Sequence, residues 1–459
     1  MHSSHPAGLG TWQLVMLALG TVVGGSFFLG TGVAIRNAGP GTLLAFAFGG
    51  LVTYLVLMAL SELTVSRPAH GSFRAYAETA FGPMASFVVG WLYWAGLVLA
   101  LSSEGIAAAI FARLWVPAIP VWAIALTVIV AVTLLNLLDV RAFAVVESAM
   151  AAIKLVAIAA FILLGLALVA GLVPGNHTPG PPAFAREVFL PRGAAGLAGS
   201  MLIVLFAYAG FEVLGLAAPE AKDPHRTVPR AVLLTVIGLV TLYVGAVALV
   251  LYVLPIGSLE EEVSPMITML RRTNFPWLAG GLNLIIMTAS LSTMLAAMYG
   301  LSRMLYSLAA EGQAPAFLKR LVPPGIPRNA IFVSSGGMMV GVVLAYLLPR
   351  SVYLFLVSSA GFALLFSYLM ILASQLVIRR REGCKPGTCA VPFFPFATWL
   401  GIILLVGAMI GMPFVPGQGA GLVAGLGMLA AFALAYLIIR RPEPEPVEQA
   451  ETDDRIPLA

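Results

Sequence analysis

Residues 20–28 read GTVVGGSFF, and they interrupt the first long apolar run of the chain at residues 13–35. Three glycines fall within six positions there, and Gly30 and Gly32 follow. Glycine costs about 1 kcal/mol relative to alanine in a helix interior, so this spacing predicts a break in the helix. The alternative is close helix packing, for which glycines are common in membrane helices, and the chain has 47 of them.

A matching interruption occurs in the sixth apolar run, where residues 206–212 read FAYAGFE and Gly215 follows. Interrupted helices at corresponding places in two halves of a chain are typical of transporter binding sites. Where a helix unwinds, free N–H groups can bind a carboxylate and free carbonyls can bind an ammonium group. The two stretches therefore predict a site for a zwitterion.

Runs of about 20 apolar residues, the length that crosses a bilayer, recur along the whole chain. They do not alternate in the manner of barrel strands, so they predict an all-α polytopic membrane protein of about twelve spans. The spans are expected near residues 13–35, 41–65, 84–112, 119–138, 145–172, 195–218, 230–254, 278–309, 330–348, 351–378, 395–413 and 419–440.

Composition excludes the main soluble classes. The 459 residues are 60% hydrophobic and 10% charged, whereas soluble domains carry about 25% charged residues. So few charges cannot cover the surface of a soluble enzyme or a nucleic-acid binder. The two cysteines cannot form a disulfide framework. No phosphate-binding loop, metal cluster or cofactor motif is found, and no covalent chemistry is expected.

The positive charge reports topology. Of the 25 Lys and Arg residues, 17 fall on the side of the two termini, seven on the opposite side, and Lys154 lies within a span. The positive-inside rule therefore places both termini in the cytoplasm. We expect a cytoplasmic N-terminal tail at 1–12, a transmembrane domain at 13–440 and a cytoplasmic C-terminal tail at 441–459.

Charged residues within spans are costly, at least about 2.5–3.5 kcal/mol each, and so need a partner or a pathway. Lys154 is either a proton carrier, a substitute for a bound cation, or one half of an ion pair with Glu147 or with a glutamate on another helix. Glu104 and Glu212 either line a cavity or form hydrogen bonds between helices. Tyr93, between Trp91 and Trp94, is interpreted as an anchor at the membrane interface.

The chain resembles the amino acid–polyamine–organocation superfamily, and within it the bacterial permeases for GABA, lysine and aromatic amino acids. The resemblance runs from the first span to the tenth. Its residues are GTVVGGSFFLGTG at 20–32, AGP at 38–40, SEL at 61–63, GSF at 71–73, GWLYW at 90–94, IKL at 153–155, FAYAGFE at 206–212, APEAKDP at 218–224 and SRMLYSLA at 302–309.

This resemblance implies a LeuT-like fold: two inverted five-helix repeats, near 13–172 and 195–378, with discontinuous helices 1 and 6, followed by two extra helices at 395–440. It also implies a binding site on the two broken spans, to which we add Glu104 as a cavity residue. The substrate-binding residues expected are Thr21, Val22, Gly24, Gly25, Ser26, Phe206, Ala207, Ala209, Glu212 and Glu104.

Lys154 is the expected coupling residue, because related carriers hold a lysine where sodium-coupled relatives hold a cation. The resemblance therefore implies a sodium-independent amino acid importer in the bacterial cytoplasmic membrane, surrounded by lipid, with Lys154 serving either proton coupling or a conformational role. Of these two we expect proton coupling. At the position of Ser26 the chain is similar to the GABA permease branch, which also has serine there. This similarity favours GABA or another neutral amino acid as the substrate. In the eighth span, Leu295 and Ala296 replace the Asn-Ser pair that is usual in this family. The alternatives are an amino acid exchanger, a cationic amino acid permease or a nutrient sensor.

Overall fold

The computed structural model describes residues 9–67, 73–138, 140–173, 182–218, 221–260, 263–273, 276–323, 325–347, 352–383, 391–415 and 417–439. Over these residues the chain is almost entirely helical, and its β contacts are two isolated bridges. The predicted C-terminal tail at 441–459, most of the N-terminal tail, and the two cysteines, Cys384 and Cys389, lie outside the described residues.

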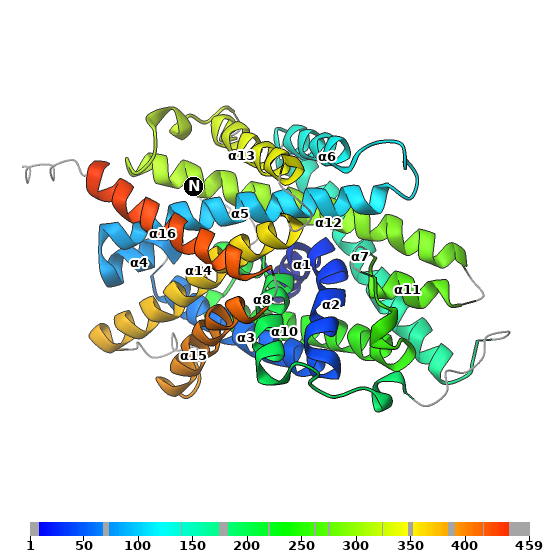
Figure 1. Ribbon diagram of the computed structural model, residues 1–459. Helices are drawn as coiled ribbons and strands as arrows, with labels where there is room; N and C mark the ends of the chain where they lie inside the picture. Colours follow the sequence, from blue (N-terminus) through cyan, green and yellow to red (C-terminus); the bar gives the residue numbers. More distant parts are fainter. Residues whose placement is uncertain are drawn as a thin grey trace, which may run out of the picture.

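Two sets of helices follow one another in the same order, and a final pair completes the chain (Figure 1). The first set is α1 (Thr11–Val22), α2 (Gly25–Ala38), α3 (Thr42–Ser66), α4 (Phe73–Phe81), α5 (Pro83–Ala112), α6 (Val121–Asn136) and α7 (Val140–Val169). The second set is α8 (Gly193–Tyr208), α9 (Glu212–Ala217), α10 (Pro224–Val253), α11 (Pro265–Arg271), α12 (Pro276–Ala310), α13 (Arg328–Leu347) and α14 (Val352–Glu382). The final pair is α15 (Phe396–Gly411) and α16 (Gly419–Ile439).

Each set contains one broken span, four continuous spans and one short helix, α4 or α11. Because five is an odd number of crossings, the second set starts on the opposite side of the membrane from the first. Figure 1 shows the consequence, since α4 and α11 lie at opposite ends of the molecule. The predicted fold class, an all-α bundle with inverted repeats and two discontinuous helices, is confirmed.

The twelve expected spans all coincide with helices or with a broken pair. Within the described residues, nine helical segments are long and apolar enough to cross a membrane, and α1, α6 and α8 are shorter apolar helices. Two of these short helices, α1 and α8, are halves of the broken spans. A continuous helix of about 20 residues is needed to span the bilayer core, so each half needs the other.

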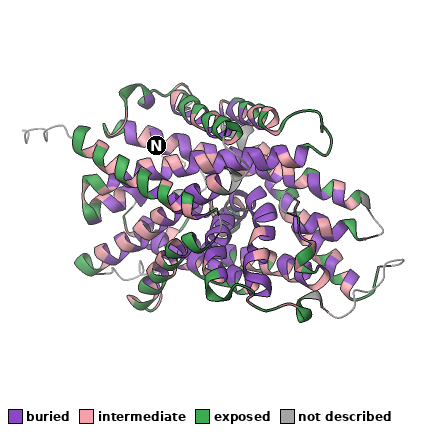
Figure 2. Cartoon of the chain, viewed as in Figure 1, coloured by how far each residue is buried: buried purple, intermediate pink, exposed green. Residues whose placement is uncertain are grey.

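The broken spans lie at the centre of the bundle. Twelve of the fourteen α2 residues are buried, whereas α16 buries only Gly421 and Gly425 among its described residues. Figure 2 shows this gradient, with buried residues in the central helices and exposed ones on the outer helices. Helix α2 packs against α8, α1 packs against α9, and α5 packs against both α12 and α14. The two interruptions are thereby brought to the core.

Candidate functional site

The first span is broken at Val23 and Gly24, inside the predicted stretch. Helix α1 ends at Val22 and α2 begins at Gly25, with Gly24 fully extended at φ −133° and ψ −175°. The Val23 carbonyl accepts a hydrogen bond of 3.1 Å from the Thr293 hydroxyl of α12. A Cβ at Gly24 would lie 2.8 Å from the same hydroxyl oxygen, so glycine is required for this close approach.

The sixth span is broken between Tyr208 and Glu212, and its turn touches the first break. Gly210 has a φ of +103°, a conformation that favours glycine. A Cβ there would lie 2.9 Å from the Thr21 carbonyl oxygen. The Thr21 hydroxyl in turn donates a 3.1 Å hydrogen bond to the Gly210 carbonyl. The two interruptions therefore form one continuous region of non-helical backbone.

The N-terminus of α2 carries a carboxylate from another helix. Glu104 of α5 accepts hydrogen bonds from the Gly25 N–H at 3.0 Å and the Ser26 N–H at 2.9 Å, one on each of its oxygens. A Cβ at Gly25 would lie 2.2 Å from the Ser290 hydroxyl oxygen and 3.0 Å from the Glu104 carboxylate. Glu104 thus occupies the N–H groups where the sequence predicts a substrate carboxylate.

Glu212, at the start of α9, accepts three hydrogen bonds from three parts of the chain. The Tyr93 hydroxyl donates at 2.8 Å, the Tyr368 hydroxyl at 3.1 Å and the Gly210 N–H at 3.0 Å. The interpretation of Tyr93 as a membrane-interface anchor is wrong, because its side chain is buried and bonded to this carboxylate. The two tryptophans beside it in the sequence favoured the interface interpretation, so the hydrogen bond to Glu212 was not predicted.

A cavity lies between the two interruptions and helices α5, α12 and α14, with about 610 Å³ of empty space including its opening. Seven predicted site residues line it: Thr21, Val22, Ser26, Glu104, Phe206, Ala209 and Glu212. Sequence reasoning missed the other lining residues: Tyr93, Leu97, Ala100, Leu101, Gly210, Val213, Thr293, Ala297, Gly300 and Leu364.

The missed residues of α5 and α12 do follow helical spacing. Residues 93, 97, 100, 101 and 104 share one face of α5, and residues 293, 297 and 300 share one face of α12. Small and apolar residues occur on every face of a membrane helix, however, so this spacing alone could not select the face. On α12 the cavity is lined by residues on either side of Leu295 and Ala296, where the chain departs from its relatives' pattern.

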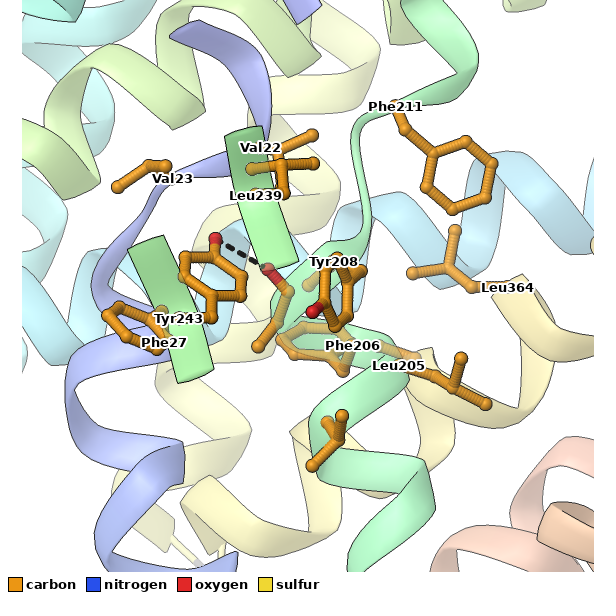
Figure 3. Packing of buried hydrophobic residues seen from close by; sticks show 14 of the residues in the cluster. Val22, Val23, Phe27, Leu205, Phe206, Tyr208, Phe211, Leu239, Tyr243 and Leu364 are labelled. Carbon is orange, nitrogen blue, oxygen red and sulfur yellow. Dashed lines mark hydrogen bonds between the residues drawn. The ribbon is translucent and has the colours of Figure 1, made fainter. Parts of the chain in front are cut away.

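Three predicted site residues adjoin the cavity without lining it. Gly24 and Gly25 face α12 through their backbone, and the Ala207 carbonyl accepts a 3.1 Å hydrogen bond from the Tyr243 hydroxyl. On one side of the interruptions, Phe27 and Tyr243 stack with ring centroids 3.9 Å apart, and Tyr208 packs beside them. Figure 3 shows these rings filling the space between α2 and α8.

The cavity extends toward the other side. Along α5 it runs from Glu104 back to Tyr93, near the start of that helix, and along α12 it runs forward to Gly300. The start of α5 and the end of α12 lie on the same side of the bundle as the start of α1. By the distribution of basic residues, this side is predicted to be cytoplasmic.

Lys154 lies apart from the cavity, where α7 meets α12. Its side chain is fully buried, and its ammonium donates a 2.9 Å hydrogen bond to the Ser292 hydroxyl. Ser292 donates in turn to Glu147 at 2.8 Å. Lys154 and Glu147 are therefore connected through a hydroxyl rather than directly. In the described part of the chain, no group of three acidic, His or Cys side chains is placed to hold a metal ion.

Comparisons with known proteins agree with this architecture. A family model described as amino acid permease matches residues 13–440. The chain is 33% identical over 437 residues to the gamma-aminobutyric acid permease of Bacillus subtilis strain 168, covering 94% of this chain and 93% of that relative. It is 35% identical over 404 residues to an aromatic amino acid transport protein of Corynebacterium glutamicum, covering 87% of each.

Among solved structures, a mutant of the manganese transporter of Eremococcus coleocola has a similar fold. The TM-score is 0.58 at 16% identity, over 95% of this chain and 96% of that one. At this identity the likeness concerns the fold alone, whereas the family match and the curated relatives extend over nearly the whole sequence. The chain is therefore a membrane-embedded, multi-pass transporter and belongs to the amino acid permease family.

Proposed function

We propose that this permease imports a neutral amino acid, with GABA as the first candidate, together with a proton and without sodium. We place it in the bacterial cytoplasmic membrane, surrounded by lipid, with both termini in the cytoplasm. The observation that carries the proposal is the buried Lys154, bonded to Ser292 at the junction of α7 and α12. A cationic side chain there can take the place of a bound metal cation.

The composition of the cavity supports a zwitterionic substrate. No lysine or arginine is among the described residues that line it, so a substrate carboxylate must be bound by backbone N–H groups and hydroxyls. Suitable donors are present at the start of α2 and at Thr21 and Ser26. An ammonium group has the Glu212 carboxylate and the carbonyls of the interrupted backbone as partners.

The arrangement of contacts supports transport by alternating access. We propose that α1, α2, α8 and α9 move with α3 and α10 against α5, α6, α12 and α13. The interrupted segments form hydrogen bonds to the second group at Glu104 and Thr293. Those contacts are the ones that must change when a substrate binds, because they join the two groups at the cavity.

The test of coupling is the Lys154→Ala variant, reconstituted into proteoliposomes with an inward proton gradient and no sodium. Loss of the buried charge should abolish accumulation of labelled substrate above equilibrium, while exchange of substrate across the membrane persists. Lys319→Ala, which removes an exposed lysine at the end of a short 3-10 helix, is the matched control and should accumulate normally.

Accumulation by Lys154→Ala equal to that of the wild type would contradict this coupling role. Uptake by the wild type that occurs only against a preloaded internal amino acid would instead make the protein an exchanger. Lys154 would then be a structural cation.

A further inference from the structure

The most informative contact in the molecule is the one that occupies the predicted anion site. Glu104 is 4% exposed, and each of its carboxylate oxygens accepts one N–H from the first turn of α2. A substrate carboxylate is expected to bind in the same way, with one oxygen on each of two consecutive N–H groups at the start of a helix. Both cannot occupy it together.

We propose that Glu104 is an internal competitor of the substrate. The substrate carboxylate displaces Glu104 from the Gly25 and Ser26 N–H groups, and the displaced Glu104 takes up one proton from solvent. This inference rests on the proposed function and deepens it, because it names the step at which substrate and proton become linked.

Electrostatics require the proton. While Glu104 is bonded to the start of α2, its negative charge is stabilised by two N–H groups and by the positive end of the helix dipole. After displacement it would be a buried carboxylate without those donors and beside a second carboxylate, which is strongly unfavourable. Binding of one proton to a Glu104 oxygen removes the charge, so the net change in the site is one zwitterion and one proton.

A hydrogen-bond acceptor for the protonated form is already in place. The Ser290 hydroxyl of α12 is fully buried and lies beside the Glu104 carboxylate. It lies next to the turn at Gly25, where a Cβ would come within 2.2 Å of it. A hydroxyl oxygen can accept a hydrogen bond, so a protonated Glu104 released from α2 can donate to it.

The charged and polar groups around Glu104 connect Lys154 to the ionisation of Glu104, although Lys154 lies outside the cavity. From α7, Lys154 acts on Glu104 electrostatically, and from α10 the Tyr243 hydroxyl does so. Ser26 of α2 and Ser290 of α12 are the neutral neighbours, and Glu212 of α9 lines the same cavity. The Lys154 charge favours ionised Glu104 in the empty carrier. We therefore expect loss of Lys154 to favour the protonated form of Glu104 and to reduce proton uptake on substrate binding.

The experiment measures proton uptake on ligand binding by the purified full-length protein in weakly buffered detergent solution. GABA is the probe, replaced, if it does not bind, by whichever protein amino acid binds most tightly. The wild type should take up about one proton per ligand, and its affinity should fall by up to about tenfold per pH unit as pH rises. Butylamine, which lacks the carboxylate, should cause no uptake.

Three variants assign the effect. Glu104→Gln should bind the ligand more tightly, with no proton uptake and no pH dependence. Glu104→Asp, shorter by one methylene, should compete less well yet keep the proton uptake, so it serves if the amide variant fails to fold. Glu187→Gln, which changes a carboxylate that accepts the Ile256 N–H outside the cavity, should behave as the wild type does.

Loss of binding by folded Glu104→Gln would overturn the inference, since Glu104 would then be a ligand of the substrate. So would wild-type binding without proton uptake. In either case, accumulation that depends on Lys154 would leave the proposed symporter standing. Failure of the wild type to bind any amino acid would instead overturn the proposed function, and this inference with it.

Discussion

The Glu212 carboxylate accepts hydrogen bonds from α5, from α14 and from the turn in the sixth span. Glu212 is only 1% exposed. A buried carboxylate is stable only when its oxygens are satisfied, so the three donors fix the start of α9 relative to α5 and α14. The position of one side chain therefore determines where the cavity wall lies.

Removal of one donor tests this role. Tyr368→Phe deletes only the hydroxyl, and a hydrogen bond to a charged group is worth about 1.5–3 kcal/mol. We expect a lower melting midpoint of the purified protein and weaker substrate uptake. Tyr346→Phe, on a residue that is 66% exposed, is the matched control. Equal melting midpoints and equal uptake by the two variants would show that the three hydrogen bonds to Glu212 contribute neither to stability nor to transport.

At the scale of residues, the sequence predicted where the helix is interrupted, but it did not predict which side chains form hydrogen bonds there. Glycine spacing at 20–28 predicted the interruption because glycine lowers helix stability wherever it stands. The partner of that interruption, Glu104, lies 78 residues further along the chain, and no local pattern specifies such a contact. The same limit concealed the bond between Tyr93 and Glu212, which depends on how three helices pack.

Among the elements, α5 and α12 determine the route to the site. Their lining residues run from the interruptions toward the start of α5, while the aromatic rings of Phe27, Tyr208 and Tyr243 fill the opposite side (Figure 3). We therefore predict that the cavity is reached from the side on which α5 starts, which the basic residues predict to be cytoplasmic.

Cysteine labelling tests that route. A Cβ at Gly300 meets nothing within 4 Å, so Gly300→Cys should fold normally. In a background with Cys384→Ser and Cys389→Ser, a membrane-impermeant maleimide should label it only in inside-out vesicles, and substrate should slow the labelling. Gly281→Cys, an equally open position near the start of α12, should react only in right-side-out vesicles. The reverse pattern at both positions would contradict the predicted orientation.

For the whole molecule, apolar run length predicted twelve spans, and each coincides with a helix or a broken pair in the described residues, because the thickness of the bilayer core imposes one length on every crossing. The inverted relation of the two sets came from the family resemblance and follows from an odd number of crossings per set. The lining of the cavity was predictable at the two interruptions and not where side chains from α5, α12 and α14 complete it. Those contacts arise only when the two sets pack against each other.

The central claim is that an amino acid and a proton cross the membrane together through this site. The most direct measurement is uptake of a labelled amino acid panel that includes GABA into proteoliposomes of the wild type, with an inward proton gradient and no sodium. The account predicts that one neutral amino acid accumulates above equilibrium and that a protonophore abolishes the accumulation. Accumulation that survives the protonophore, or that requires sodium, would contradict it.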